Sequence, residues 1–360
     1  MAGSRPLNPM RLTILSSKRA LHTALFFPGH GVQRVGMANA WIESFPHTSA
    51  QVLDEMDSTL GLKLSAIISD GPNSKLNKTE NSQPAVMATS VLILRILEQE
   101  FGFDVKSRID VTLGHSLGEF SALVAGGYLT FGDALRLVRR RAEIMAQCTR
   151  TLIEQSGETY GMVALLCEPE HLDGLLRTVQ DFLGVDPRAP RATHCTRPRQ
   201  FSKWSSRTSI PGIKLCSAVV LTASKRYCPF HSPAMARATD YMRDAVEQID
   251  IKFPASLPCI SNVSALPFQS KEDLKDLLSR QCTDTVRWWD SIRYLHQERG
   301  VRRWIGIGPG KVGRNLVGKE VGRVDAKGGG VWAVCDPREI PEIMIALEET
   351  ESEGQTREPQ

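Results

Sequence analysis

The chain has 360 residues, of which 41% are hydrophobic and 23% are charged, as expected of a globular protein with one large or two moderate domains. No apolar run approaches the roughly 20 residues that a membrane-spanning helix needs. The formal net charge of +4 comes from two local segments that contain no acid, residues 1–42 and 187–239, so it does not predict a nucleic-acid-binding surface.

The cysteines and the first residues both indicate a cell compartment. The eight cysteines are scattered, without a C-x-x-C pair or a histidine cluster at the spacing of metal ligands. We therefore expect reduced thiols in an intracellular compartment and no metal site. Residues 1–22 are basic, lack acids and include Ser4, Ser16 and Ser17, a composition typical of a mitochondrial transit peptide. A disordered tail without a role is the alternative.

Strands and helices are predicted to alternate from residue 23 onwards. Thr23–Phe27 is predicted as a short buried strand that runs into a glycine-rich turn, which presents backbone N–H groups but lacks the G-x-G-x-x-G pattern of a dinucleotide site. Helices are expected at 38–45, 49–60 and 64–69, followed by a loop at 70–78. A long, mostly buried helix is then expected to start at Ser82, which can cap it, with Pro84 in its first turn.

Residues 110–119 (DVTLGHSLGE) predict a short buried strand, a sharp turn and a helix that continues to residue 126. Ser116 lies at the turn in a G-x-S-x-G frame. Gly114 and Gly118 have no Cβ, so the strand and the helix can pass closely on either side of a strained serine. The helix N-terminus would present N–H groups where an oxyanion forms. This pattern is typical of a nucleophile elbow, and equally of a glycine-rich turn around a buried hydroxyl.

The helix expected at 130–148 carries a run of arginines. Arg139, Arg140 and Arg141 span most of a helical turn, so they cannot all point the same way. Each is a candidate for a solvated or ion-paired surface residue, and one could turn inward to hold a carboxylate with its forked guanidinium.

The regular pattern is interrupted between residues 156 and 228. Tyr160–Leu166 is predicted as a strand and Pro169–Gly184 as an amphipathic helix, which together begin a small α+β insertion. Residues 187–228 are basic and rich in proline, serine and threonine, and only Ile213–Ala223 is able to form a strand.

Regular structure resumes at residue 229. Helices are expected at 234–248, 271–280, 286–297, 312–317 and 340–348, and strands at 258–262, 303–307 and 331–334. Residues 349–360 are polar and expected to be disordered. The alternation predicts one discontinuous α/β domain with a largely parallel sheet, residues 23–155 and 229–348, interrupted by the insertion at 156–228.

Four motifs in chain order resemble those of the malonyl-CoA:acyl carrier protein transacylase family, the acyltransferases of fatty-acid and polyketide synthesis. The motifs are FPGHG at 27–31 with Gly36-Met37, GHSLGE at 114–119, PFHSP at 229–233 and GIGPG at 306–310. With the transit-like start, the chain looks like the mitochondrial enzyme. The resemblance covers about residues 24–185 and 229–347. It implies an α/β-hydrolase-like large domain with an inserted ferredoxin-like subdomain.

The resemblance implies the catalytic residues. Ser116 would attack the malonyl thioester, and His231 would take its proton and return it to the leaving thiol. Considered alone, His231 would be interpreted as a core histidine. The main-chain carbonyl of Gln281, rather than an aspartate, would orient it. The backbone N–H groups of Leu117 and His30 would form the oxyanion hole.

The resemblance also implies a substrate site. Arg141 follows the candidate nucleophile by 25 residues and matches the family arginine that binds the free malonyl carboxylate. Such an arginine would reject acetyl groups, which leave its charge unpaired. Gln83, His115 and Phe230 would line the pocket, the last within a malonyl-type signature. Asn262 falls in a Ser-Asn-Val stretch that the family shares and could simply hold a turn.

Two features depart from the family. Most members have glutamine in place of His30. Because the hole uses the main-chain N–H, the change could be tolerated, or it could bring a second imidazole near Ser116. Residues 187–228 match nothing in the family although the length is roughly kept. A frame change keeps length while it destroys pattern, so we expect a local frameshift or a mis-spliced gene model that damages the subdomain and puts the activity in doubt.

The expected function is a ping-pong transfer of malonyl from malonyl-CoA to the phosphopantetheine thiol of holo-acyl carrier protein, through a malonyl-serine. We expect no metal or redox cofactor, no nucleic-acid or membrane partner, and a monomer in the mitochondrial matrix. Two alternatives stay open. An α/β-hydrolase-type esterase or thioesterase would need an HGGG-type oxyanion loop, which the sequence lacks, and would give Arg141 no purpose. A catalytically dead carrier-binding protein is supported only by the damaged insertion.

Overall fold

The computed structural model describes residues 22–157, 174, 177, 229–322 and 329–355. The transit-like segment lies outside these residues except for His22, which begins the first strand. The predicted insertion at 156–228 also lies outside them, apart from its first two residues and residues 174 and 177. Its predicted strands at 160–166 and 213–223, its helix at 169–184 and the irregular segment at 187–228 are therefore not described.

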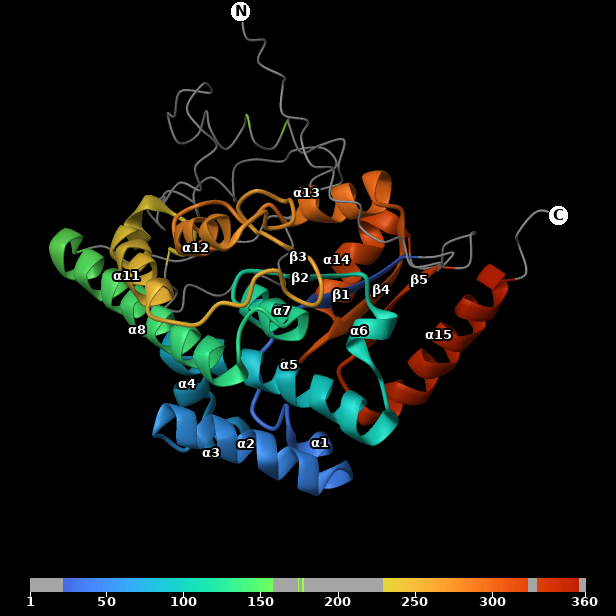
Figure 1. Ribbon diagram of the computed structural model, residues 1–360. Helices are drawn as coiled ribbons and strands as arrows, with labels where there is room; N and C mark the ends of the chain where they lie inside the picture. The colour runs from blue at the N-terminus through green and yellow to red at the C-terminus, as the bar shows by residue number, and fades with distance from the viewer. Residues whose placement is uncertain (1–21, 158–173, 175–176, 178–228, 323–328, 356–360) are drawn as a thin grey trace, which may run out of the picture.

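In the described part of the chain a five-stranded, entirely parallel sheet forms the centre of the fold (Figure 1), with strand order β3-β2-β1-β4-β5. The strands are β1 (His22–Phe27), β2 (Val111–Gly114), β3 (Cys259–Ile260), β4 (Val301–Ile307) and β5 (Gly330–Val334). The prediction of an α/β fold with a parallel sheet is confirmed. The expected strand at 258–262 shrinks to two residues.

Both faces of the sheet are covered, which explains why residues 24–27 of β1 are all apolar instead of alternating with polar residues. Along β1, Leu25 and Phe27 enter a large core, whereas Ala24 and Phe26 enter a smaller core on the opposite face. The large core includes α5 (Thr79–Phe101), α7 (Gly118–Gly126) and α8 (Phe131–Ser156). The smaller core includes α13 (Trp288–Arg293) and α14 (Val312–Val321) (Figure 1).

Further helices complete the described layers. They are α1 (Asn39–Ser44), α2 (Pro46–Leu60), α3 (Leu64–Asp70), α4 (Asn73–Leu76), α6 (Val105–Arg108), α11 (Ala236–Glu247), α12 (Lys271–Arg280) and α15 (Ile340–Gln355). The loop expected at 70–78 thus contains a short helix, and residues 349–355 continue α15 where we expected a disordered tail. Among the helices in the described ranges, none combines the length and the apolar character that crossing a bilayer requires.

Helix α5 starts three residues before the predicted start, so Ser82 is not its cap and Pro84 lies inside the helix. A proline there has no N–H for the carbonyl four residues earlier, which belongs to Glu80. That carbonyl instead accepts a hydrogen bond from Arg139 Nη1 at 2.7 Å. A tertiary contact from α8 therefore satisfies the acceptor that proline leaves open, and propensity alone could not have located the helix start.

The carboxyl ends of the strands bring the sequence motifs together. The ends of β1 and β2 pair directly, with Phe27 beside Gly114. A Cβ on Gly308, in the loop after β4, would lie 2.7 Å from the Pro28 ring. The FPGHG, GHSLGE and GIGPG motifs therefore meet at the carboxyl ends of the strands, where open α/β sheets generally bind ligands.

Candidate active site

The turn between β2 and α7 is a sharp elbow around Ser116. This residue has φ 53°, in the left-handed region that side chains rarely occupy. A Cβ on Gly114 would lie 2.0 Å from the Gly118 backbone, and one on Gly118 would lie 2.6 Å from the Phe27 carbonyl oxygen. The close passage expected from the sequence is present, and only glycine fits at either position.

The Asn262 side chain forms hydrogen bonds to the backbone at two positions of this strained turn. Its Oδ1 accepts from the Ser116 N–H at 2.7 Å, and its Nδ2 donates to the Gly114 carbonyl at 2.7 Å. Its own N–H donates to Glu119 Oε1 at 2.9 Å. Asn262 therefore does more than hold its own turn, because one amide fixes the backbone before and at the serine.

The Ser116 hydroxyl lies against an imidazole. Ser116 Oγ and His231 Nε2 are 2.8 Å apart, and His231 Nδ1 lies 2.7 Å from the Gln281 carbonyl oxygen. A carbonyl can only accept, so Nδ1 carries the proton and Nε2 accepts from the serine. Burial, followed by Arg141 and His115, lowers the pKa of His231 to about 3. The imidazole is thus neutral near pH 7 and able to act as a base.

Of the arginine run on α8, Arg141 turns inward. Its side chain is 1% exposed, and it donates to Gln83 Oε1 at 2.6 Å and to Gln281 Oε1 at 2.7 Å. Its Nη2 also lies 3.5 Å from Ser116 Oγ. Arg139 and Arg140, in contrast, both pair with a glutamate one turn along α8. Two neutral amides orient the inward guanidinium without cancelling its charge.

The side chains of Gln281 and Glu119 belong to the same site, and sequence reasoning missed both. Gln281 Nε2 donates to the Ser116 carbonyl at 2.8 Å and to Glu119 Oε2. Burial raises the pKa of Glu119 to about 7, although hydrogen bonds from Asn262 and Gln281 and the charge of Arg141 oppose the shift. The available signal was a carboxylate in the first turn of an otherwise apolar helix.

The candidate oxyanion donors come from two elements. Leu117 is the N-cap of α7, where backbone N–H groups lack helical acceptors. The His30 ring makes a hydrogen bond with Ser82 Oγ at 2.8 Å and contacts the Phe230 ring edge-on at 5.6 Å. Burial and the Arg141 charge lower the pKa of His30 to about 4, so the ring is neutral near pH 7. The ring thus joins the turn after β1 to α5.

The remaining predicted pocket residues lie around the elbow. Phe230 is buried beside His30. The His115 ring packs edge-on against the Trp288 ring, with the centroids 5.6 Å apart, and burial lowers the pKa of the imidazole to about 4. The backbone N–H of His115 donates to the Phe27 carbonyl. Within the described ranges, no three His, Cys, Asp or Glu side chains gather as potential metal ligands.

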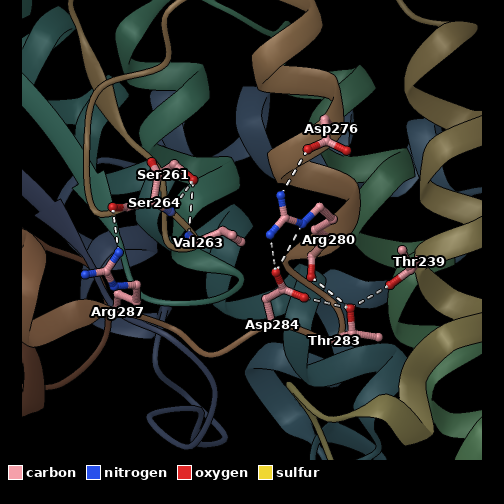
Figure 2. A network of polar contacts seen from close by, with 9 residues as sticks. All are labelled: Thr239, Ser261, Val263, Ser264, Asp276, Arg280, Thr283, Asp284 and Arg287. Carbon is pink, nitrogen blue, oxygen red and sulfur yellow. Dashed lines mark hydrogen bonds and ion pairs between the residues drawn. The ribbon is translucent and has the colours of Figure 1, made fainter. Parts of the chain in front are cut away.

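An outer network supports the segment that carries Gln281 (Figure 2). Arg280 donates to Asp276 at 3.2 Å and to Asp284 at 2.8 Å, and so brackets the end of α12. Thr283 Oγ1 lies 3.3 Å from a threonine hydroxyl of α11 and donates to Asp284 at 3.1 Å. The carbonyl that bonds the imidazole therefore sits on a backbone that is held from both sides.

Comparisons with known proteins identify the family of this chain. Residues 25–156 match the family described as acyl transferase domain. The chain is 35% identical over 333 residues to the malonyl CoA-acyl carrier protein transacylase of Bacillus subtilis (strain 168), which covers 91% of this chain and 97% of the relative.

Solved structures are similar over nearly the same extent. The acyl-carrier-protein-S-malonyltransferase of Bartonella henselae has a TM-score of 0.71 and 28% identity, covering 91% of this chain and all of that one. A malonyl-transacylase solved in complex with a type II polyketide acyl-carrier protein has a TM-score of 0.70 and 27% identity, covering 91% of this chain and 99% of that one. With a relative 35% identical along almost its whole length, the chain belongs to the malonyl CoA-acyl carrier protein transacylase family of acyltransferases.

Proposed function

We propose that this chain transfers malonyl from malonyl-CoA to the phosphopantetheine thiol of acyl carrier protein through a malonyl ester of Ser116. One observation carries the proposal. Ser116 Oγ lies 2.8 Å from His231 Nε2 and 3.5 Å from Arg141 Nη2, so a base and a carboxylate anchor converge on one buried oxygen. Family membership supports the same reaction.

In the first half-reaction His231 Nε2 takes the Ser116 proton while Oγ attacks the thioester carbonyl carbon. The resulting oxyanion would be held by the backbone N–H groups of Leu117 and His30. Collapse of the tetrahedral intermediate breaks the carbon–sulfur bond, and the His231 proton passes to the departing CoA thiolate, which leaves as the thiol. The Gln281 carbonyl stabilises the imidazolium between these two transfers.

The second half-reaction is the reverse with a different thiol. After CoA leaves, the carrier thiol gives its proton to His231 and its sulfur attacks the malonyl ester. Ser116 Oγ then leaves and recovers the proton. The relative that was solved with an acyl-carrier protein supports a carrier as the second substrate. Oxidation states do not change, so the reaction needs no redox cofactor, and proton transfer by His231 gives a metal no required role.

Malonyl selectivity would come from Arg141, which Gln83 and Gln281 orient without supplying a negative charge. The free carboxylate of malonyl completes a charge-assisted pair with the guanidinium. An acetyl group offers nothing to it and leaves a buried cation unpaired, which is costly.

The decisive experiment is intact-protein mass spectrometry after malonyl-CoA is mixed with the parent chain and with Ser116→Ala. We expect a malonyl adduct on the parent, none on the variant, and loss of the adduct when holo-acyl carrier protein is added. A parent that is folded by circular dichroism and takes no adduct would refute the proposal. Release of free malonate without transfer to the carrier would favour a thioesterase.

Three further proposals come from the sequence. We propose that residues 1–22 direct the chain to the mitochondrial matrix to supply fatty-acid synthesis there, which a fluorescent fusion of this segment would test.

Residues 156–228 would form an inserted ferredoxin-like subdomain, with 187–228 altered by a local frameshift or by a mis-spliced gene model. Matches to the family in another reading frame of the DNA would support the error, and their absence would refute it. Gel filtration would test the proposed monomer.

A further inference from the structure

We propose that Glu119 is a positioning residue for malonyl selectivity, because its carboxylate sets the orientation of the Gln281 side-chain amide, which in turn aims the Arg141 guanidinium. The inference rests on the proposed role of Arg141 as the site of the malonyl carboxylate. It concerns a carboxylate that lies beneath the elbow and has no place in the proton transfers described above.

Glu119 is held at both carboxylate oxygens. Its side chain is 1% exposed, in the first turn of α7. Oε1 accepts from the Asn262 backbone N–H at 2.9 Å, and Oε2 accepts from Gln281 Nε2. A backbone N–H cannot rotate, and the Asn262 side chain is committed to the elbow. One oxygen is thus fixed, which leaves the other to face Gln281.

The Gln281 amide has one donor end and one acceptor end, and its surroundings distinguish them. Nε2 has two acceptors, Glu119 Oε2 and the Ser116 carbonyl at 2.8 Å. Oε1 consequently faces Arg141 Nη2 at 2.7 Å. A flipped amide would place its N–H groups against the guanidinium and its carbonyl against the carboxylate, both of which are repulsive. The carboxylate therefore selects the amide orientation that supports the arginine.

A neutral side chain of the same shape cannot replace this carboxylate. Glutamine at position 119 would have one accepting oxygen for two donors, so its own NH₂ would face either the Asn262 N–H or Gln281 Nε2. The flexible partner, Gln281, would yield, and its bond to Arg141 would weaken or reverse. Protonated Glu119 has the same defect, because one of its oxygens becomes a donor.

Protonation of Glu119 falls within an accessible pH range, since burial raises its pKa to about 7. The charged and titratable groups that interact with it in the described part of the chain are Arg141 on α8, which favours the carboxylate, and Cys259 on β3. Burial also raises the pKa of Cys259, so its thiol stays neutral. His231, with its pKa lowered to about 3, does not titrate in the same range.

The test compares acylation of Ser116 by malonyl-CoA and by acetyl-CoA in the full chain and in three variants. The variants are Glu119→Gln, Arg141→Ala and Glu154→Gln. Glu154 is an exposed glutamate on α8, so Glu154→Gln serves as the matched control. For Glu119→Gln we expect kcat/KM for malonyl-CoA to fall about tenfold or more, while kcat/KM for acetyl-CoA changes by less than about threefold. Glu154→Gln should leave both unchanged.

A second readout needs no variant. In the parent, the malonyl-to-acetyl ratio of kcat/KM should fall as the pH is lowered through about 7, because Glu119 becomes protonated. The ionisation of CoA affects both substrates alike and cancels in the ratio. A ratio that stays flat between about pH 5.5 and pH 8 would overturn the proposal, whether or not Glu119→Gln folds.

The variants separate this inference from the function on which it rests. Equal losses for both substrates in a folded Glu119→Gln would assign Glu119 a merely structural role and overturn the inference. Loss of malonyl preference in Arg141→Ala, but not in Glu119→Gln, would do the same while the role of Arg141 stands. If Arg141→Ala keeps the preference, the proposed function of Arg141 fails, and this inference fails with it.

Discussion

His231 Nδ1 lies 2.7 Å from the carbonyl oxygen of Gln281, so a peptide dipole rather than a carboxylate fixes the imidazole. The carbonyl selects the tautomer in which Nε2 accepts from Ser116 Oγ, 2.8 Å away. It raises the imidazole pKa less than a full negative charge would, and burial together with Arg141 lowers that pKa to about 3. The imidazole is therefore already neutral at neutral pH, as a general base must be.

The buried histidines predict that the fold loses stability in acid. Burial is the largest cause that lowers the pKa of His30 and His115 to about 4 and that of His231 to about 3. As the pH falls below about 6.5, the unfolded chain binds protons at these sites and the folded chain does not, so the free energy of unfolding falls. Glu119 opposes this trend, because its pKa of about 7 lets the folded state bind the proton first.

Urea titrations would measure this dependence. Near pH 5 these four groups bind about two more protons in the unfolded state, which gives a slope of at most about 3 kcal/mol per pH unit. His115→Gln should reduce the slope by about 1.4 kcal/mol per pH unit, which corresponds to the contribution of one proton. Stability that rises as the pH falls from about 6.5 to about 5 in the parent would contradict the assigned shifts.

Arg141→Lys should impair malonyl transfer although it keeps the positive charge. The guanidinium reaches Gln83 and Gln281 simultaneously, and an ammonium on a flexible stem cannot reproduce that fork. We expect kcat/KM for malonyl-CoA to fall by about 10²-fold. Arg140→Lys, at an exposed ion pair on the same helix, is the matched control and should keep activity. Similar losses in both variants would point to helix α8 rather than to the fork.

Local sequence patterns located most elements because hydrophobic runs and turn residues act within a few positions. The predicted α12 matches at both ends, since Ser270 caps it and acidic residues occupy its first turn. The early start of α5 was missed because its proline is supported by Arg139, which is distant in sequence. The depth of Arg141 and the partners of Glu119 likewise depend on contacts with residues near 281, which no local pattern encodes.

Asn262→Ala should damage the elbow more than an ordinary surface truncation. It leaves the Ser116 N–H and the Gly114 carbonyl without their side-chain partner in a buried turn. Each buried unsatisfied group costs about 1–3 kcal/mol, so for these two groups we expect a loss of roughly 2–6 kcal/mol in the free energy of unfolding. Urea denaturation measures the loss, with Asn315→Ala on the exposed face of α14 as control. A loss below about 1 kcal/mol would show that the elbow keeps its conformation without the Asn262 side chain.

His30→Gln tests the departure from the family glutamine. The backbone N–H at position 30 is kept, and a glutamine amide can still bond Ser82 Oγ as the imidazole does. We therefore expect the rate of Ser116 acylation to stay within about threefold of the parent. A loss of tenfold or more in a folded protein would instead give the imidazole a direct part in the reaction.

Gly114→Ala should abolish the elbow, and this is the sharpest test of the local geometry. A Cβ at this position would lie 2.0 Å from the Gly118 carbonyl carbon and oxygen, which are backbone atoms that cannot move aside alone. We expect a loss of more than about 3 kcal/mol or failure to fold, together with loss of acylation. Gly132→Ala is the matched control, because its nearest neighbour would be a flexible Arg136 side chain at 3.6 Å. Alanine there should be neutral or stabilise α8 by up to about 1 kcal/mol. If Gly114→Ala acylated Ser116 at the parent rate, the β2–α7 crossing could not have the geometry on which the catalytic proposal depends.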